Sequence, residues 1–566
     1  MKRWLLLAGI VALGVAAIVL SERQKVDAPA SPAALLYLVA DAEQELTRMP
    51  VSFTRMTDSE EIQIGDGLAR LYLSGEERKN PDDRAVDQYL TRVGLSLAVR
   101  AHRKLPYKFH YLSDPHLINA FALPGGHIFV GEGLLALMDS EDELAAVIGH
   151  EIEHVDHYHC AERAQREQAL RKLPLGGLVA LPIEVFEAGY SKDQEMEADR
   201  EGTRLAAEVG YSANGAIRLF ETFDRLYKIY QSPASQPRTP QDEALRVAVQ
   251  AMEGYFRSHP LPEERIAQIR TLIATQGWTA RPERDLAVAY IFWTARAARS
   301  LAVHKYSEAE QLAKRSLKLK PGQGNALQVL ARAEFSQAEF AAAAEAYRGY
   351  LESDTLDLEA VNEYALTLAA ANRHTALAEF RQWSSTFKGE PPREITVAEA
   401  GLALLEGEAE PARKMEAEFQ HPSDTTAVNW IEQTGWWRYL AGDYPRAVEL
   451  LAQADQLHPG HRALREKLAW AQIEIRHYGD ALASVDMSLR SGEPLPTAVP
   501  AVVHWRTQEK DEALREFESV LAEQPEWANV NLVKGLYAPT VAQNVEEILA
   551  ERERRAKERA AAQHPR

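Results

Sequence analysis

The second half of the chain repeats with a period of about 34 residues, and this period restricts the fold more than any other feature. An alanine recurs at seven positions separated by 34, 33, 36, 35, 34 and 32 residues: Ala309, Ala343, Ala376, Ala412, Ala447, Ala481 and Ala513. A small residue lets two helices approach closely, and about 34 residues is the length of a tetratricopeptide helix pair. Such pairs stack into a curved solenoid. We therefore expect an α-solenoid over residues 281–548.

Residues around these alanines support the same interpretation. Four positions after most anchors stands a residue that fills the groove between helices, at Ala313, Tyr347, Phe380, Leu451, Val485 and Phe517. Twelve positions after three anchors stands a proline that ends the second helix, at Pro321, Pro459 and Pro525. The repeat at Ala412 is degenerate because Glu416 occupies the packing position. An irregular helical bundle is the alternative. The solenoid's concave face is expected to bind a client or partner, and residues 549–566 to form a solvated charged tail.

The N-terminal segment is expected to be an export signal. Met1-Lys2-Arg3 is basic, and the run from Trp4 to Leu20 is entirely apolar. This pattern is typical of a secretory signal or a retained signal anchor within residues 1–30. The apolar run is at the lower edge of the length that spans a bilayer. Both alternatives stay open, and residues 4–20 are the candidate membrane anchor.

Net charge and cysteine content exclude nucleic acid as a partner and two possible roles of cysteine. The formal net charge is −19, so the chain repels phosphate backbones and nucleic acid is not an expected partner. Cys160 is the only cysteine. An intramolecular disulfide and a thiolate zinc cluster are therefore both excluded.

The sequence His150-Glu151-Ile152-Glu153-His154 is the sharpest chemical signal. On a helix the two histidines share one face and can reach one ion, while Glu151 can act as the general base of a hydrolase. The pattern Ser140-x-x-Glu143 is a capping box that begins this helix. We therefore predict a zinc metallopeptidase domain at residues 31–280. Glu153 lies roughly opposite the metal face and is expected to be exposed to solvent.

A catalytic zinc ion needs a third protein ligand. His157 lies on the same face, but seven residues of helix rise about 10.5 Å, which is too far for one ion. Glu195 and Asp199 are four apart on a later helix. We expect Glu195 to bind the zinc, in preference to Glu197, and Asp199 to orient a ligand imidazole.

Three motifs in order resemble a known family. Leu105–Leu112 and Ala120–Val130 read as strands of a small sheet within a helix-rich domain. The run Asn119–Val130, the His150–His154 helix and the segment Glu195–Asp199 together resemble the metallopeptidase family of the CAAX prenyl endopeptidases. The resemblance is strongest to the soluble, tetratricopeptide-bearing branch, the periplasmic β-barrel assembly-enhancing proteases. It covers roughly residues 50 to 275 and continues through the repeats.

The resemblance implies further roles. The segment from Asn119 to Val130 would form a strand beside the cleft, to which a substrate adds as another strand. Its candidate substrate-binding residues are Asn119, Ala120, Phe121, Gly125 and Gly126. His259 would either stabilise the oxyanion or occupy the open position of the zinc ion and silence the enzyme. The implied location is the periplasm, free or anchored to the inner membrane.

The resemblance also names clients and partners. The clients would be misfolded or stalled outer-membrane proteins, and the partner the barrel-assembly machinery. The rival hypothesis is a repeat-based chaperone or assembly scaffold with a structural or silent zinc site. Glu151 favours the enzyme, because a structural site needs no base. A membrane-embedded prenyl-protein protease is disfavoured, because the apolar stretch 173–190 is short and broken by prolines and glycines. That stretch reads as a lid or a packing loop.

Overall fold

The structure is a computed structural model of the whole chain, and it describes residues 56–73, 80–171, 190–231, 262–279, 281–353, 357–387, 389–418, 426–489 and 496–563. The candidate signal at residues 1–30, most of the stretch 173–190 and His259 lie outside these residues. Within the described ranges, no helix combines the length and the apolar character needed to cross a membrane.

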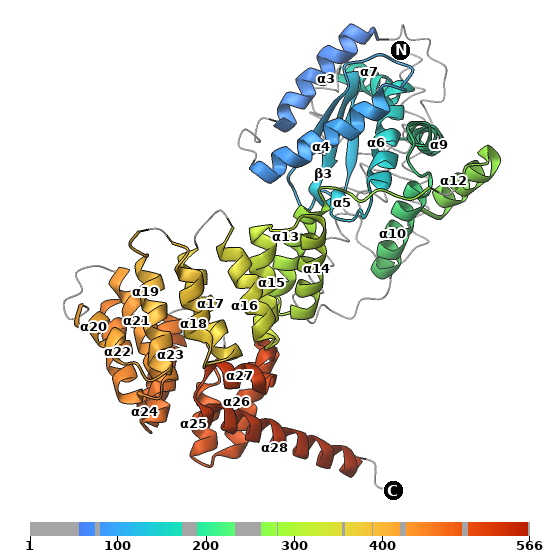
Figure 1. Cartoon of the computed structure of the whole chain (residues 1–566). Helices are drawn as coiled ribbons and strands as arrows, with labels where there is room; N and C mark the ends of the chain where they lie inside the picture. Colours follow the sequence, from blue (N-terminus) through green and yellow to red (C-terminus); the bar gives the residue numbers. More distant parts are fainter. Residues whose placement is uncertain are drawn as a thin grey trace.

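The first half of the chain forms a helix-rich domain around a small sheet (Figure 1). Its elements are α3 (Asp58–Leu73), α4 (Pro81–Ala98), β1 (Lys108–Leu112), β2 (Ala120–Leu123), η1 (Pro124–Gly126), β3 (His127–Gly131), α5 (Glu132–Leu135), α6 (Glu141–Asp156), α7 (His159–Arg171), α9 (Lys192–Val209), α10 (Asn214–Gln231) and α12 (Pro262–Gln276). The strand order is β1-β3-β2, with β1 parallel and β2 antiparallel to β3. The main core joins α4, the sheet, α6, α9 and α10.

The expectation of one strand over Asn119–Val130 was wrong. The chain reverses at η1, where Gly125 has φ 78° and Gly126 has φ 96°. Glycine adopts these left-handed angles at low cost. A Cβ at Gly125 would also lie 2.6 Å from the Cα of Ile62 in α3. The segment is therefore a hairpin, and β2 becomes an edge strand of the sheet.

The second half is the predicted solenoid of helix pairs. Its helices are α13 (Ala289–Ala302), α14 (Tyr306–Leu319), α15 (Gly324–Ser336), α16 (Phe340–Leu351), α17 (Leu358–Ala371), α18 (Ala376–Ser384), α19 (Arg393–Leu405), α20 (Glu410–Glu418), α21 (Thr426–Leu440), α22 (Tyr444–Leu457), α23 (Arg462–Glu474), α24 (Tyr478–Leu489), α25 (Val499–Arg506) and α26 (Lys510–Glu523). All seven anchor alanines lie in the second helix of a pair and are at most 1% exposed. The predicted fold class is confirmed.

Ion pairs stabilise the degenerate repeat around Glu416. Glu416 is 9% exposed and accepts hydrogen bonds from Arg438 Nε at 2.7 Å and Arg446 Nε at 3.0 Å. A carboxylate at a packing position is costly unless it is paired. The two arginines supply that pairing, so this repeat keeps its place in the stack.

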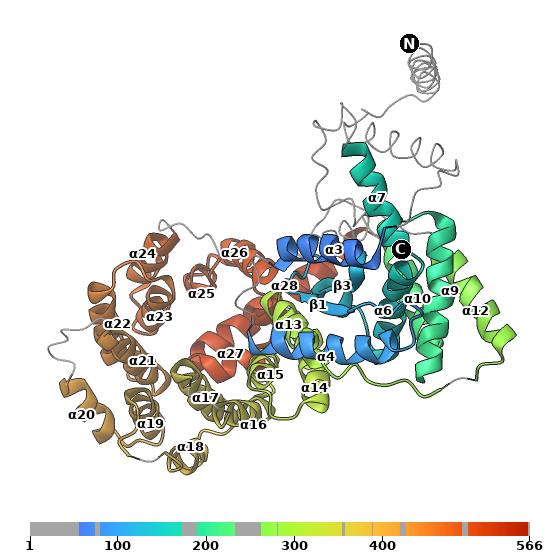
Figure 2. The same cartoon turned by 90° about the horizontal axis from the view of Figure 1, so that it is seen from above.

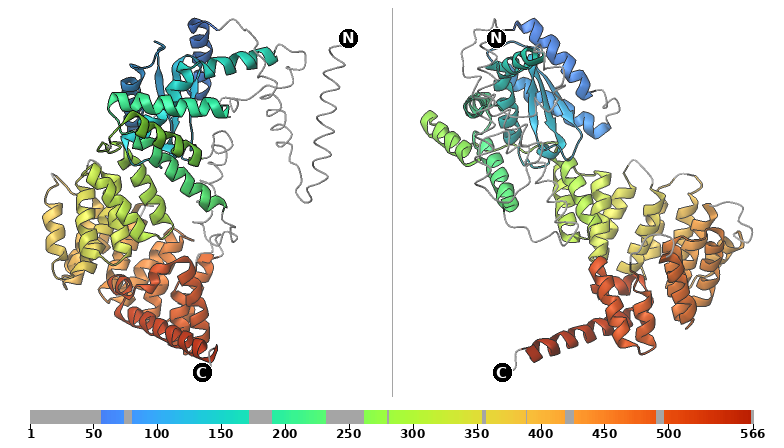
Figure 3. Two further views of the ribbon diagram at one scale, coloured as in Figure 1. Left: turned by 90° about the vertical axis from the view of Figure 1, so that its right-hand side faces the viewer. Right: turned by 180° about the vertical axis from the view of Figure 1, so that it is seen from behind.

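The end of the chain folds back inside the curve. After η3 (Pro525–Ala528) comes α27 (Val530–Leu536), which lies within the arc of the inner helices in Figure 2. The Asn529 side chain donates to the carbonyl of Gln337 at 3.0 Å, and Ala538 N donates to the Tyr439 hydroxyl at 3.0 Å. The concave face is thus partly covered by the chain itself. α28 (Pro539–Gln563) then extends away from the repeats (Figure 3).

Hydrogen bonds connect the segment before α13 to the start of α6. Asp142 accepts a hydrogen bond from Arg284 N at 2.7 Å, and Glu141 N donates to the Arg284 carbonyl at 2.9 Å. Arg315 of α14 adds an ion pair to Asp139 at 3.0 Å. The repeats are therefore attached at the N-terminal end of the helix that carries both candidate histidine ligands.

Candidate metal centre

The helix α6 begins where the capping box predicts. Ser140 Oγ accepts from Glu143 N at 3.2 Å, and the Glu143 carboxylate accepts from Ser140 N at 2.8 Å. These two bonds satisfy backbone donors that a helix start otherwise leaves unpaired. The helix then runs without a break through both histidines to Asp156.

Two glycines bring α9 against α6. A Cβ added at Gly149 would lie 2.7 Å from the Gly202 carbonyl oxygen, and one added at Gly202 would lie 2.5 Å from His150 N. Only hydrogen atoms fit at this crossing. The close approach of the backbones carries Glu195, in the first turn of α9, to the histidine face of α6.

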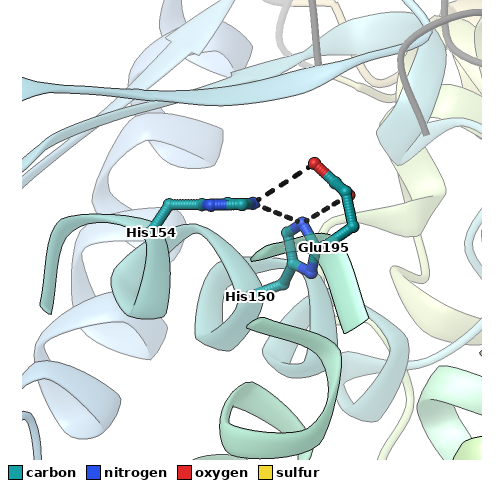
Figure 4. Close-up of side chains that lie close together, drawn as sticks. All are labelled: His150, His154 and Glu195. Atoms are coloured by element: carbon teal, nitrogen blue, oxygen red, sulfur yellow. Dashed lines mark hydrogen bonds and ion pairs between the residues drawn. The ribbon is translucent and has the colours of Figure 1, made fainter. Parts of the chain in front are cut away.

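Three side chains converge at this crossing (Figure 4). His150 Nε2 lies 3.0 Å from His154 Nε2 and 3.5 Å from Glu195 Oε2, and His154 Nε2 lies 3.6 Å from Glu195 Oε1. The residues are 7%, 1% and 0% exposed, respectively. One ligand atom from each lies within 4.8 Å of the others.

The hydrogen bonds on the outer nitrogens fit a cation at this point. His150 Nδ1 lies 2.9 Å from Asp199 Oδ1, and an ionised carboxylate only accepts, so this nitrogen carries the proton. His150 Nε2 then presents a lone pair toward His154 and Glu195. Two imidazole nitrogens and a carboxylate form the donor set that zinc prefers in catalytic sites. The residues present therefore fit a zinc ion.

A buried ion pair stands behind the first histidine. Arg265 of α12 contacts Asp199 twice, through Nη2 at 2.5 Å and Nε at 2.6 Å. Although burial opposes ionisation of Asp199, the charge of Arg265 and the hydrogen bonds from Arg265 and His150 hold its pKa well below the usual range. Burial likewise opposes protonation of His150, but the hydrogen bond to Asp199 raises its pKa.

Glu151 lies beside the ligands with an altered acidity. Burial raises the pKa of Glu151 to about 7, against the lowering influence of His150 and of a backbone hydrogen bond from Ala122. Burial also raises the pKa of Glu195, and His150 and Arg265 oppose that rise. A carboxylate whose pKa lies near neutral pH is suited to exchange protons during catalysis.

An apolar pocket opens next to these groups. His150, Glu151, Asp199 and Arg265 form its polar side. The apolar side comes from β2, α5, α6 and α10, at Ala120, Leu134, Ala146, Val147, Ala216, Leu219, Phe220 and Phe223. A mostly apolar concavity with a few convergent polar groups is the usual form of a substrate site.

Comparison with known proteins identifies the peptidase domain. Residues 84–273, about a third of the chain, match Peptidase family M48. These residues form a domain of that family. Residues 438–492 match a tetratricopeptide repeat, within the solenoid. The M48 domain thus stands before a tetratricopeptide solenoid, as the family resemblance predicts.

Named relatives share this domain. A putative beta-barrel assembly-enhancing protease of Vibrio cholerae is 30% identical over 259 residues, which are 41% of this chain and 49% of that protein. The beta-barrel assembly-enhancing protease of Escherichia coli is 27% identical over 253 residues, 41% and 47% of the two chains. The mitochondrial metalloendopeptidase OMA1 of Schizosaccharomyces pombe is 30% identical over 178 residues, 30% and 52% of the two chains. The chain spans about half the length of these curated relatives.

The edge strand β2 turns backbone groups toward α6. In an antiparallel pair, alternate residues direct their peptide groups away from the partner strand. Gly131 N donates to the Asn119 carbonyl at 3.0 Å, so this alternation places Ala120 and Ala122 on the outer side. The backbone N–H of Ala122 donates a hydrogen bond to Glu151. Its carbonyl accepts one from the Cys160 thiol at 3.6 Å. Ala120 lines the apolar pocket of the M48 domain.

The other residues predicted for the substrate strand have packing contacts. The Phe121 ring stacks on Phe129 at 5.0 Å between centroids. Gly125 and Gly126 lie in the η1 turn, where Gly125 N donates to Glu61 of α3 at 3.1 Å. The side-chain Oδ1 of Asn119 is buried without a hydrogen-bond partner in the part of the chain that the structure describes.

One expectation about α6 was wrong. Glu153 is only 3% exposed, and burial raises its pKa to about 8. His157 Nε2 lies 3.2 Å from Glu153 Oε2, so the pair shares the side of α6 that faces α9. The helical wheel placed Glu153 opposite the His150 and His154 face, whereas the structure places it against α9. The burial of Glu153 results from the packing of α9 on α6, which the sequence pattern of α6 alone does not show.

Two residues near the candidate ligands were not predicted to take part in the metal site. His159 Nδ1 lies 2.9 Å from His154 Nδ1. The ring of Tyr190 stacks on His154 with centroids 3.9 Å apart. The sequence offers a weak signal for His159, since it follows the motif closely at the start of α7. It offers none for Tyr190, which meets the site from the start of the segment before α9.

Proposed function

We propose that this protein is a zinc-dependent metalloendopeptidase of the cell envelope. The observation that carries the proposal is the convergence of His150, His154 and Glu195 beside the buried carboxylate of Glu151. Membership in peptidase family M48 supports the same chemistry. Structural zinc sites take four protein ligands, whereas catalytic sites take three and leave a position open. Three ligands converge among the described residues.

Each part of the site has a role in peptide hydrolysis. A bound zinc ion would supply a Lewis acid and lower the pKa of a water molecule to about 7. Glu151 would accept a proton from the attacking water and return it to the leaving amine. Asp199 holds the tautomer of His150 that presents Nε2 to the ion, and Arg265 balances the charge of Asp199.

The substrate would lie along β2 as an added strand. Ala120 supports this placement because it lines the same pocket as His150 and Glu151, and the strand alternation directs its peptide groups away from β3. Backbone pairing gives affinity for extended, unfolded segments, and the apolar pocket would select one side chain near the cut. His259 remains proposed as a group that stabilises the oxyanion or blocks the ion.

The proposed clients are misfolded or stalled outer-membrane proteins, and the solenoid would hold them or the barrel-assembly machinery near the cleft. The names of the Vibrio cholerae and Escherichia coli relatives support this proposal. The proposed location is the periplasm, with residues 4–20 as either a removed signal or an inner-membrane anchor. A scaffold with a silent zinc site is the alternative function.

The test uses the whole chain with its zinc content quantified. Parent protein, Glu151→Gln and a control, Glu208→Gln, are incubated with an unfolded outer-membrane barrel protein, and fragments are mapped by mass spectrometry. Glu208 is exposed on the same helix as Glu195. Cleavage by the parent and control but not by Glu151→Gln, at equal zinc content, supports the peptidase. Zinc bound without cleavage by any variant favours the scaffold, unless His259→Ala releases activity.

A further inference from the structure

The two histidine ligands are held in different ways. His150 contacts the carboxylate of Asp199, which is paired with the buried guanidinium of Arg265. Behind His154 stands another histidine, His159, which is 5% exposed and begins α7. His159 Nε2 in turn lies 3.5 Å from an oxygen of Glu197, whose side chain is 36% exposed. A chain of polar groups therefore leads from the second ligand to the protein surface.

The chain has a fixed direction if His154 binds the ion through Nε2. His154 Nδ1 then carries the proton and donates it to His159 Nδ1 at 2.9 Å. His159 must hold its own proton on Nε2, which points to Glu197. Each ring thereby fixes the tautomer of the next. The outer contact is longer than an ordinary hydrogen bond, so most of the ordering rests on the inner one.

Charge balance explains why a histidine stands here. A zinc ion carries two positive charges, and Glu195 and Glu151 already offer two negative ones at the buried site. Asp199 adds a third, which Arg265 neutralises. Another buried carboxylate behind His154 would need a further cation, because an unpaired buried charge is costly. His159 accepts the hydrogen bond without a charge, and Glu197 places the negative charge where water reaches it.

The ring plane of His154 is also held in place, by Tyr190. The Tyr190 ring lies against His154 at 3.9 Å, while its backbone N–H donates to Glu195 Oε1 at 3.3 Å. Its hydroxyl lies 3.2 Å from the Cys160 thiol. Tyr190 prevents rotation of the imidazole out of plane, but it cannot select the protonated nitrogen. That selection falls to His159.

We propose that His159 is the positioning residue for His154, with Glu197 as its surface anchor. His159 and Glu197 set the tautomer that presents His154 Nε2 to the metal. They also place the negative charge that balances the proton on His154 at the protein surface. This inference rests on the proposed metal site, and it concerns metal binding itself and not the client or the cleavage step.

The test measures zinc affinity by chelator competition in the whole chain. Removing an outer hydrogen-bond partner of a ligand typically lowers metal affinity by about 10-fold to 100-fold. We expect such a loss for His159→Phe, which fills the space without an acceptor. His159→Asn keeps an acceptor at the place of Nδ1 and should restore most of the affinity. Glu197→Gln should lose less than His159→Phe, and Glu197→Lys more than Glu197→Gln.

Two further readouts separate positioning from folding. The visible absorption of the cobalt-substituted protein should change in His159→Phe and return toward the parent spectrum in His159→Asn. The melting temperature of the metal-free protein should differ little between these two variants. A control, His116→Asn, changes an exposed histidine in the loop between β1 and β2, and it should bind zinc as the parent does.

The proposal is overturned if His159→Phe binds zinc with the parent affinity and spectrum, or if His159→Asn loses as much affinity as His159→Phe. Should His159→Phe fail to fold, equal affinity of the parent, Glu197→Gln and Glu197→Lys would overturn it instead. A parent chain that binds no zinc would reject the proposed metal site itself. A parent that binds zinc but cleaves nothing would reject only the proposed activity.

Discussion

Gly202 of α9 touches His150 of α6 through backbone atoms, and a Cβ at Gly202 would lie 2.5 Å from His150 N. No side chain fits between the two helices at this point. The separation of the helices thereby sets how far Glu195 stands from the histidines. The geometry of the proposed metal site therefore depends on Gly202, which is not itself a proposed ligand.

Gly202→Ala should push α9 away from α6. Overpacking of a tight contact typically costs about 1–3 kcal/mol in the free energy of unfolding. We expect a lower midpoint in urea together with weaker zinc binding, because Glu195 moves with its helix. The control is Gly67→Ala in α3, where a Cβ meets nothing within 4 Å and the helix should gain stability. Unchanged zinc affinity in Gly202→Ala would contradict the role given to this contact.

Arg265→Met should leave Asp199 charged and buried without its cation. Breaking a buried ion pair by removing one partner costs about 3–5 kcal/mol. The double variant Asp199→Leu, Arg265→Met should cost less than the sum of the single changes, measured by urea unfolding. Additive costs would show that the two residues do not act as a pair.

The same pair predicts a pH dependence. The folded pKa of Asp199 lies below its unfolded value, so its contribution to stability is full above about pH 4. The contribution is lost as pH falls from there through the folded pKa. The parent should therefore lose stability faster than the double variant on acidification below pH 4. Parallel stability curves would contradict this reading.

Cys160 should be inert in the folded protein. The residue is 0% exposed, and burial raises the pKa of its thiol to about 12. At pH 8 about one molecule in ten thousand would carry the reactive thiolate. A thiol reagent such as Ellman's should label the native chain far more slowly than the chain in guanidinium. Fast labelling of a chain that is still folded would show that the region around Tyr190 opens readily.

The sequence predicted helix α6 and the shared face of His150 and His154 because the needed signals are local. A capping box sets the helix start, and a spacing of four places His150 and His154 together. The repeat anchors were predictable for the same reason, since each helix pair contacts mainly its neighbours. Alanines at a period near 34 residues report that contact directly.

Other features needed the tertiary structure. The segment after Asn119 reads as one strand because its residues favour strands, but the positive φ angles at Gly125 and Gly126 reverse the chain. Glu153 is buried because α9 packs against its side of α6, and a helical wheel does not show which side a neighbouring helix covers. The return of α27 into the solenoid joins residues about 190 apart in sequence, such as Asn529 and Gln337, and no local pattern encodes such a contact.

One metal ion at His150, His154 and Glu195 is proposed to make this chain a peptidase. The most direct measurement removes the metal with a chelator and returns zinc stepwise while cleavage of an unfolded barrel protein is followed. We expect cleavage to stop when the metal is removed and to return in full at one equivalent of zinc. Glu195→Gln should bind zinc more weakly and stay inactive at that point. Cleavage that persists in the metal-free chain, or full activity of Glu195→Gln at one equivalent, would contradict this proposal.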